Sequence, residues 1–169
     1  MKLIELRKED ESEFKHLMQE SFQYGYESVF GKSAELILPE KDIDECLDKP
    51  NSHAYEMIDN NVIVGGAIVE INENNHNELD LLFVNINSQS KGIGQRIWKE
   101  IEKLYPDTVT WQTHTPYFDK RNIHFYVNKL GFHIVEYYNE RNPEPDMPEN
   151  EHFEEAGGMF RFEKNYGKF

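Results

Sequence analysis

The pattern of apolar and polar residues predicts two kinds of element along the chain. Strands are expected where apolar residues alternate with polar ones or are β-branched, and these segments are residues 2–6, 54–58, 62–71, 78–84, 108–114, 133–138 and 159–163. Polar, asparagine-rich turns separate the second, third and fourth segments, because asparagine tolerates a positive φ. The middle of the chain is therefore predicted to form an antiparallel meander.

Helices are expected where apolar residues recur every three or four positions, and these segments are residues 10–22, 39–47, 93–104 and 123–130. Asp10 with Glu13 is a predicted N-cap with its reciprocal partner. Pro39 suits a first helical turn, and Gly131 stands where a left-handed C-cap is needed. The resulting order, β-α-α-β-β-β-α-β-α-β-β, predicts an α+β sandwich with a mixed, mostly antiparallel sheet.

Composition is that of one folded domain, residues 1–169, with 38% apolar and 30% charged residues. The apolar stretches have only strand length, and the N-terminus turns polar too soon for a signal peptide. We therefore expect a cytoplasmic protein with no membrane association. Cys46 is the single cysteine, which excludes an internal disulfide and favours a packing role.

The net charge of −14 disfavours nucleic acid as a partner, because such a surface repels phosphate backbones. It would attract cationic amines, although the same charge also serves to keep a protein in solution. No spacing among the seven histidines suggests a metal site.

The segment at residues 78–96 carries the most chemical information, because a strand and a short loop lead into a helix start with two glycines. Glycine lets backbone N–H groups approach a ligand, and the positive end of a helix favours an anion such as a pyrophosphate. Lys91 and Arg96 add local positive charge. The segment matches neither a P-loop nor a dinucleotide fingerprint. Taken alone, it is equally consistent with a plain tight turn.

Two motifs together resemble those of the GNAT superfamily of N-acetyltransferases. The first is the Gln-x-x-Gly-x-Gly run from Gln89 to Gly94, and the second is the segment at residues 122–132, in which a Phe-Tyr pair precedes Gly-Phe. The order of elements matches along nearly the whole chain. The resemblance implies a bacterial-like α/β/α sandwich and acetyl-coenzyme A as the acetyl donor.

The resemblance also implies where acetyl-coenzyme A binds. The backbone of Leu82, Phe83 and Val84 would pair with the pantetheine arm where the strand at 78–84 splays from the strand at 108–114, and the Val84 N–H would point at the thioester oxygen. Asn122 would add a further contact, although Asp119 stands where many members carry asparagine. The pyrophosphate would be held by the loop and first helical turn, namely Gln89, Ser90, Lys91, Gly92, Ile93, Gly94 and Gln95.

Catalytic roles follow from the same resemblance. Glu78 lies 11 residues before Gln89, as does the general base of the histone-acetylating branch, and Asp80 is the reserve candidate. Strand alternation predicts that Glu78 and Asp80 share one face with Leu82 and Val84. A chain of water molecules could replace either carboxylate. Tyr126 would protonate the thiolate, and its alternative role is that of a core aromatic.

The acceptor is predicted to be a primary amine, either a small cationic molecule or a peptidyl amine. Aromatic residues at 22–30 and acidic residues at 139–155 would suit a cation, although a solvated acidic loop would have the same sequence. The alternative function is a noncatalytic sensor or interaction module that binds acetyl-coenzyme A. Members of this superfamily often dimerise, so a homodimer remains an open expectation.

Overall fold

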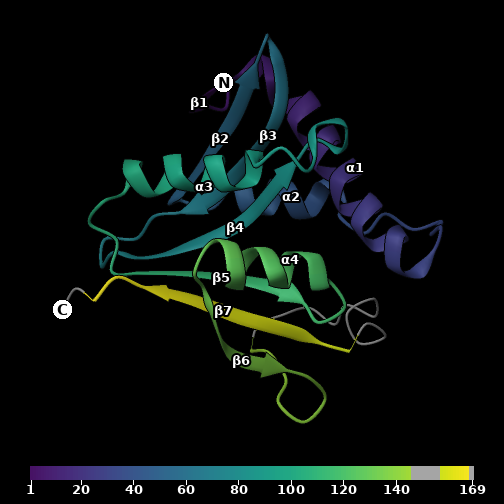
Figure 1. Cartoon of the computed structure of the whole chain (residues 1–169), viewed down its shortest axis with the longest axis vertical. Helices are drawn as coiled ribbons and strands as arrows, with labels where there is room; N and C mark the ends of the chain where they lie inside the picture. The colour runs from purple at the N-terminus through teal and green to yellow at the C-terminus, as the bar shows by residue number, and fades with distance from the viewer. Residues whose placement is uncertain (146–156, 168–169) are drawn as a thin grey trace. The chain divides into compact units, whose positions relative to one another are not determined.

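The computed structural model describes residues 1–145 and 157–167, and the chain divides into two compact units, Met1–Thr108 and Val109–Phe169 (Figure 1). Each unit has its own antiparallel strand pairs. Much of the predicted acidic loop, including Asp146, Glu149, Glu151, Glu154 and Glu155, lies outside the described residues. None of the helices in the described ranges has the length and apolar content needed to span a membrane.

The first unit contains four strands, which pair in the order β1-β2-β3-β4. The four neighbours form an antiparallel meander, as the alternating pattern predicts. Its elements are β1 (Lys2–Glu5), η1 (Lys8–Asp10), α1 (Glu11–Phe30), α2 (Glu40–Leu47), β2 (Ser52–Asp59), β3 (Val62–Glu70), β4 (His76–Val84), η2 (Ile86–Ser88) and α3 (Ile93–Leu104).

Helices cover both faces of this sheet. On one face, Phe14 and Met18 of α1 and Ile43 of α2 form a buried cluster with Ile68 and Phe83 of the sheet. On the other face lies α3, because a Cβ on Gly65 would stand 2.8 Å from the Ile97 side chain. We call these the α1/α2 face and the α3 face. The first unit is therefore a three-layered α/β/α arrangement.

A β-bulge in β4 changes which side chains share a face. Ile68 pairs with Leu81, but Val69 pairs with Leu79, so Asp80 is an extra residue in the ladder. Because neighbouring residues of β3 point to opposite faces, Leu81 faces α1 and α2 whereas Leu79 faces α3.

The bulge contradicts the prediction that Glu78, Asp80, Leu82 and Val84 share one face. Glu78 pairs with Glu70 on the α1/α2 face, and Val84 pairs with Gly65 on the α3 face. Simple alternation fails because, after one inserted residue, every following side chain of the strand points to the opposite face from the one expected.

Among its described residues, the second unit has three strands in the order β5-β7-β6 and one short α-helix. Helix α4 continues into a π-helical turn, in which Tyr126 packs edge-on against Phe132, with 5.6 Å between ring centroids. Gly131 follows with φ of 82°, as the predicted left-handed C-cap requires. The elements are β5 (Thr110–Pro116), α4 (Lys120–His124), η3 (Phe125–Lys129), β6 (His133–Tyr138) and β7 (Met159–Asn165).

The order of strands and α-helices matches the prediction, and the α+β class with mostly antiparallel pairing is confirmed. The first helix is longer than predicted and ends at Phe30. Asp10 is the N-cap residue of α1, as predicted, but the capping bonds are not, because its side chain makes no hydrogen bond to the helix. Its carboxylate instead accepts a hydrogen bond from Arg7 Nε at 2.6 Å.

Candidate active site

The loop between β4 and α3 is held in a strained, specific conformation. Asn85 fixes its start, since its amide donates to the Ile63 carbonyl at 3.1 Å and its side-chain oxygen accepts from the Asn87 N–H at 3.0 Å. Ser90 and Gly92 then adopt the left-handed region, with φ of 65° and 74°. Helix α3 begins directly after the second of these residues, at Ile93.

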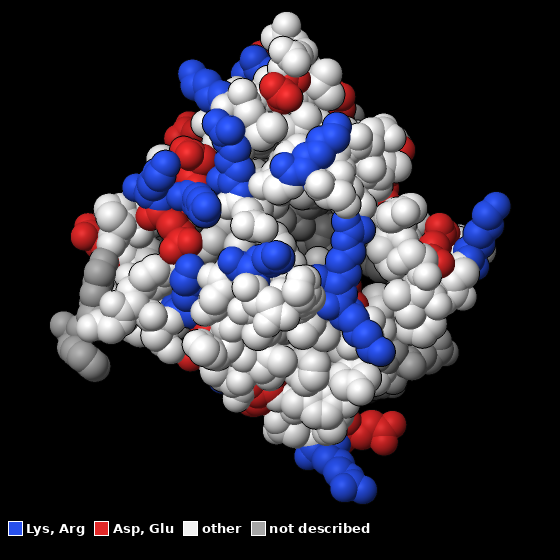
Figure 2. All heavy atoms as spheres, viewed as in Figure 1, with Lys and Arg blue, Asp and Glu red and all other residues white. Residues whose placement is uncertain are grey.

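This loop and helix start have the properties of an anion site. The first-turn N–H groups of α3 have no acceptor within the helix, and the helix dipole makes this end positive. A Cβ on Gly92 would meet no atom within 4 Å, so the loop leaves open space beside it. The exposed side chains of Lys91 and Arg96 flank the turn. Figure 2 shows Lys and Arg side chains gathered over the face that α3 covers, although the whole chain has a net charge of −14.

The pyrophosphate-binding residues predicted from the sequence thus lie in one continuous turn. Its members are Gln89, Ser90, Lys91, Gly92, Ile93, Gly94 and Gln95.

The last residues of β4 direct their backbone groups toward two different edges. Asn85 donates its N–H to the Val64 carbonyl, toward β3. Because successive N–H groups of a strand point to opposite edges, the Val84 and Leu82 N–H groups point away from β3. Phe83 anchors this segment, since its buried ring packs edge-on against Phe14 with 5.2 Å between centroids. The Val84 N–H therefore has the direction required of a donor to a ligand at the edge of β4 that lies away from β3.

The two candidate bases lie together on the α1/α2 face. Glu78, Asp80 and the neighbouring Glu70 each bring a carboxylate oxygen within 4.8 Å of the others. Burial is the largest cause that raises the pKa of Asp80 to about 6, and the charges of Glu78 and Glu70 act in the same direction. The Lys49 ammonium opposes these effects. Asp80 is therefore a carboxyl group poised to exchange a proton near neutral pH.

Tyr126 and Asn122 belong to the second unit. Tyr126 is buried, and burial raises the pKa of its phenol, with a smaller contribution from the charge of Asp119. A phenol in this environment keeps its proton until a strong base is formed beside it. Asp119 is the N-cap of α4 and accepts the Asn122 N–H at 3.0 Å. Asp119 thus has a structural use that explains why an acid is tolerated at that position.

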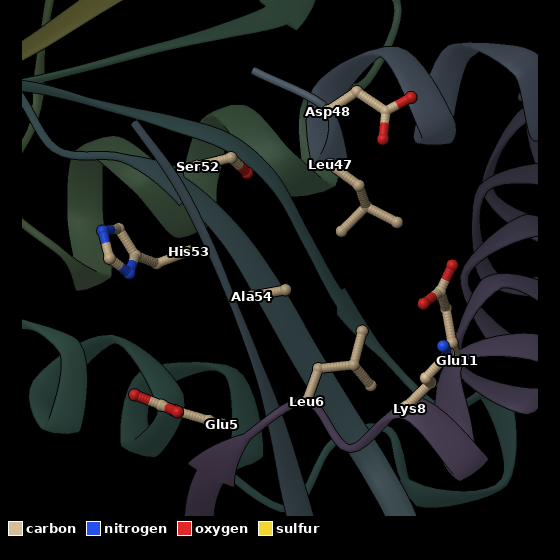
Figure 3. A pocket seen from close by; sticks show the side chains of 9 residues that line it. All are labelled: Glu5, Leu6, Lys8, Glu11, Leu47, Asp48, Ser52, His53 and Ala54. Carbon is tan, nitrogen blue, oxygen red and sulfur yellow. The ribbon is translucent and has the colours of Figure 1, made fainter. Parts of the chain in front are cut away.

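An open hollow of about 500 Å³ lies elsewhere on the first unit, over β1 and β2 (Figure 3). It contains none of the predicted site residues. Its lining consists of Glu5, Leu6, Lys8, Glu11, Leu47, Asp48, Ser52, His53 and Ala54.

Lys49 and Asn85 are the site residues that sequence reasoning missed. Lys49 contacts Asp80, which is 31 positions away, so no local pattern could reveal the pair. Asn85 follows a predicted strand directly, and asparagine after a strand is a recognised turn signal that could have identified it. The expectation that the chain binds no metal is not tested by this arrangement and stays a prediction.

Comparison with known proteins identifies the class. The model of the acetyltransferase (GNAT) family matches residues 12–132 of this chain. PaiA N-acetyltransferase from Thermoplasma acidophilum, solved in complex with coenzyme A, is structurally similar, with a TM-score of 0.73, 18% identity and 98% of both chains covered. The ribosomal-protein-S18-alanine N-acetyltransferase from Escherichia coli gives a TM-score of 0.71 at 14% identity, covering 97% of this chain and 92% of that one. These likenesses show the fold, which is that of acetyltransferases.

The chain belongs to the acetyltransferase (GNAT) family, as the match over residues 12–132 shows. It is also similar to the uncharacterized protein YrkN of Bacillus subtilis (strain 168), with 47% identity over 151 residues, or 88% of this chain and 82% of YrkN. The resemblance inferred from the two sequence motifs is thereby confirmed.

Proposed function

We propose that this chain transfers an acetyl group from acetyl-coenzyme A to a primary amine. The observation that carries the proposal is the turn at residues 89–94, in which Ser90 and Gly92 are left-handed and α3 presents its N-terminus to open space. The pyrophosphate of coenzyme A is the kind of anion that such a turn binds. Membership of the acetyltransferase family and the coenzyme A bound to PaiA support the same donor.

Acetyl-coenzyme A would supply the activated acetyl group, and residues of this chain would orient it and move protons. The backbone of Leu82, Phe83 and Val84 would bind the pantetheine arm, with the Val84 N–H donating to the thioester oxygen. Asn122 would add a contact from the second unit. Each of these roles is a proposal that combines the family resemblance with the direction of the backbone groups in β4.

Proton movement completes the reaction. The acceptor arrives as an ammonium ion and must lose a proton before its nitrogen can form the new C–N bond. Glu78 would accept that proton directly or through water, with Asp80 in reserve. As the C–S bond breaks, Tyr126 would donate its phenolic proton to the sulfur, and it would recover a proton released by the amine nitrogen. The products are the N-acetylated acceptor and coenzyme A.

The acceptor is proposed to be cationic, either a small amine or a peptidyl amine. The carboxylates of Glu70, Glu78 and Asp80 on the α1/α2 face and the net charge of −14 support this class. The cytoplasmic location and the homodimer expected from the sequence stay predictions. A noncatalytic acetyl-coenzyme A sensor is the second candidate, because the anion-binding turn would be equally useful to a binding module.

Calorimetric titration with acetyl-coenzyme A and with coenzyme A tests the donor. Wild type should bind both with micromolar dissociation constants, and Gly92→Glu should weaken binding at least about tenfold, because it places a bulky anion at the anion site. Gly31→Glu is a matched control, since Gly31 is also left-handed, with φ of 83°, and has no atom within 4 Å of an added Cβ.

Thiol release with a panel of amines then separates the two candidates. Turnover supports the enzyme and identifies the acceptor class. Binding without turnover on small amines, polyamines and peptides would favour the sensor. Absence of binding by folded wild-type protein would refute both.

A further inference from the structure

The hollow over β1 and β2 has an apolar floor. Figure 3 shows the side chains of Leu6 and Leu47 pointing toward each other across Ala54. All three residues pack against the buried cluster of the α1/α2 face. The volume of about 500 Å³ is within the range of clefts that bind ligands. The floor would therefore suit an aliphatic side chain.

The rim of the hollow carries more negative than positive charge. Of the lining residues, one is a lysine, Lys8, and three carry carboxylates, namely Glu5, Glu11 and Asp48. Glu11 pairs with Lys15 at 3.3 Å, but the Lys15 ammonium also binds two carboxylates of α2 at 3.3 and 2.6 Å. Lys15 therefore does not cancel the charge of the rim, which complements that of a cation.

A backbone edge of β2 borders the same hollow. The ladder between β1 and β2 ends at Glu5, and beyond it Leu6 donates its N–H to the Ala54 carbonyl at 2.9 Å. Because backbone direction alternates along a strand, the Ser52 carbonyl and the Ala54 N–H also point to this edge. A peptide residue beside His53, in a segment parallel to β2, would donate to the first group and accept from the second.

Ser52 adds an observation that is independent of charge. Its Oγ atom is buried and has no hydrogen-bond partner among the described residues. Figure 3 shows this hydroxyl turned toward the Leu47 side of the hollow. Because burying an unpaired hydroxyl is unfavourable, a ligand that offers Ser52 a polar group would bind more tightly.

The hollow lies on the same face as the β4 carboxylates. Ser52 pairs with Glu70 across β2 and β3, and Glu70 pairs with Glu78 across β3 and β4. Neighbouring strands are about 4.8 Å apart, so Ser52 and Glu78 are separated by about 10 Å across the sheet. An extended peptide covers that distance in about three residues.

We propose that the hollow anchors a peptide acceptor, by binding an extended segment in which apolar and basic side chains alternate, about three residues from the amine that is acetylated. The apolar side chains would contact the floor. The basic ones, which point the opposite way in an extended peptide, would contact Glu5. This inference rests on the proposed function and selects the peptidyl amine over the small amine as the acceptor.

Calorimetry with a blocked peptide, acetyl-Leu-Arg-Leu-Arg-amide, tests the anchor. The probe has no primary amine, so it cannot be an acceptor. Wild type should bind it, and Glu5→Lys should weaken binding at least about fivefold, because a contact between opposite charges becomes a repulsion. Glu73→Lys is the matched control, since it changes the net charge equally in an exposed turn before β4, and it should leave the affinity nearly unchanged.

Ser52→Ala tests the hydroxyl separately. It should weaken binding of the blocked peptide about threefold. It should not lower the melting temperature, because Ser52 Oγ has no described partner to lose. Thermal melts of every variant confirm folding. Equal loss of binding in Glu5→Lys and Glu73→Lys would show that only net charge attracts the peptide, and would overturn the anchor.

Turnover distinguishes this inference from the proposed function. A peptide that adds a lysine three residues after the last arginine should be acetylated with kcat/KM at least about fivefold higher than its counterpart with glutamate in place of arginine. Glu5→Lys should remove most of this preference. If folded wild type acetylates small amines but does not bind the blocked peptide, the anchor is refuted and the proposed function stands. If wild type binds the blocked peptide but acetylates no amine, the proposed function fails, and the acceptor role of the hollow fails with it.

Discussion

Glu56 shows how one buried side chain links the N-terminal segment to the sheet. Its carboxylate has no exposed surface and accepts a hydrogen bond from Arg7 Nε at 3.1 Å. Burial is the largest cause that raises the pKa of Glu56 to about 7, and Asp10 adds to the effect. Arg7 opposes it. The same contacts explain why the Asp10 side chain makes no capping hydrogen bond to α1, because its carboxylate is directed to Arg7.

The raised pKa predicts a pH-dependent contribution to stability. Between the ordinary pKa of a glutamate and pH 7, the folded state binds more protons at Glu56 than the unfolded state does, so the free energy of unfolding decreases as pH rises. Glu56→Gln removes this loss while keeping an acceptor for Arg7. From pH 5 to pH 8, the variant should gain on the order of 1 kcal/mol relative to wild type.

Urea denaturation at several pH values measures this difference. Glu73→Gln, in the exposed turn before β4, serves as the control. Its free energy of unfolding should change with pH as that of wild type does. A constant difference between Glu56→Gln and wild type across the pH range would contradict the assignment.

At the level of elements, two adjacent glycines allow β3 to lie close to its neighbours. A Cβ on Gly66 would collide with the Phe14 ring and would stand 2.6 Å from the Tyr55 carbonyl oxygen. On the opposite face, a Cβ on Gly65 would stand 2.6 Å from the Phe83 carbonyl oxygen. Backbone atoms cannot move aside as side chains do, so both positions require the smallest residue.

Alanine substitutions at glycine should therefore have opposite effects in β3 and in α1. Gly66→Ala should lower the free energy of unfolding by about 1–3 kcal/mol through overpacking. Gly25 lies within α1, and an added Cβ there would have no atom within 4 Å. Gly25→Ala should therefore raise the free energy of unfolding by about 0.5–1 kcal/mol through the higher helix propensity of alanine. Denaturant midpoints compare the two variants, and similar values would refute the close approach seen at β3.

Elements were predictable where the signal is local. Helix α3 has the predicted bounds because its apolar residues are regularly spaced, and the glycine turn before it was recognised as the candidate anion site. The sequence could not predict that Glu78 and Val84 point to opposite faces of the sheet. A bulge depends on how two strands pair rather than on either strand's sequence alone. Lys49 escaped detection for the same reason, because its partners are distant in the chain.

For the molecule as a whole, the excess of acidic residues predicts how stability responds to salt. With a net charge of −14, repulsion among carboxylates favours expansion, and added salt screens this repulsion. Raising NaCl from 10 mM to 300 mM at pH 8 should stabilise the fold by about 1 kcal/mol, or roughly 2–4 °C in Tm. Near the isoelectric point of about 4.9, the same salt increment should change Tm little. Equal responses at the two pH values would show that net charge is not the cause.

The extra residue at Asp80 also shifts the two-residue alternation of side chains along β4 by one position. Before it, even-numbered positions of β4 face α1 and α2; after it, odd-numbered positions do. If this strand kept all of its residues and the facing of Val84 but paired without the bulge, the side chains of Glu78 and Asp80 would both lie on the face that α3 covers. Whether an alignment treats the bulge residue as an insertion therefore decides whether Glu78 is assigned to the α1/α2 face or to the α3 face of the sheet.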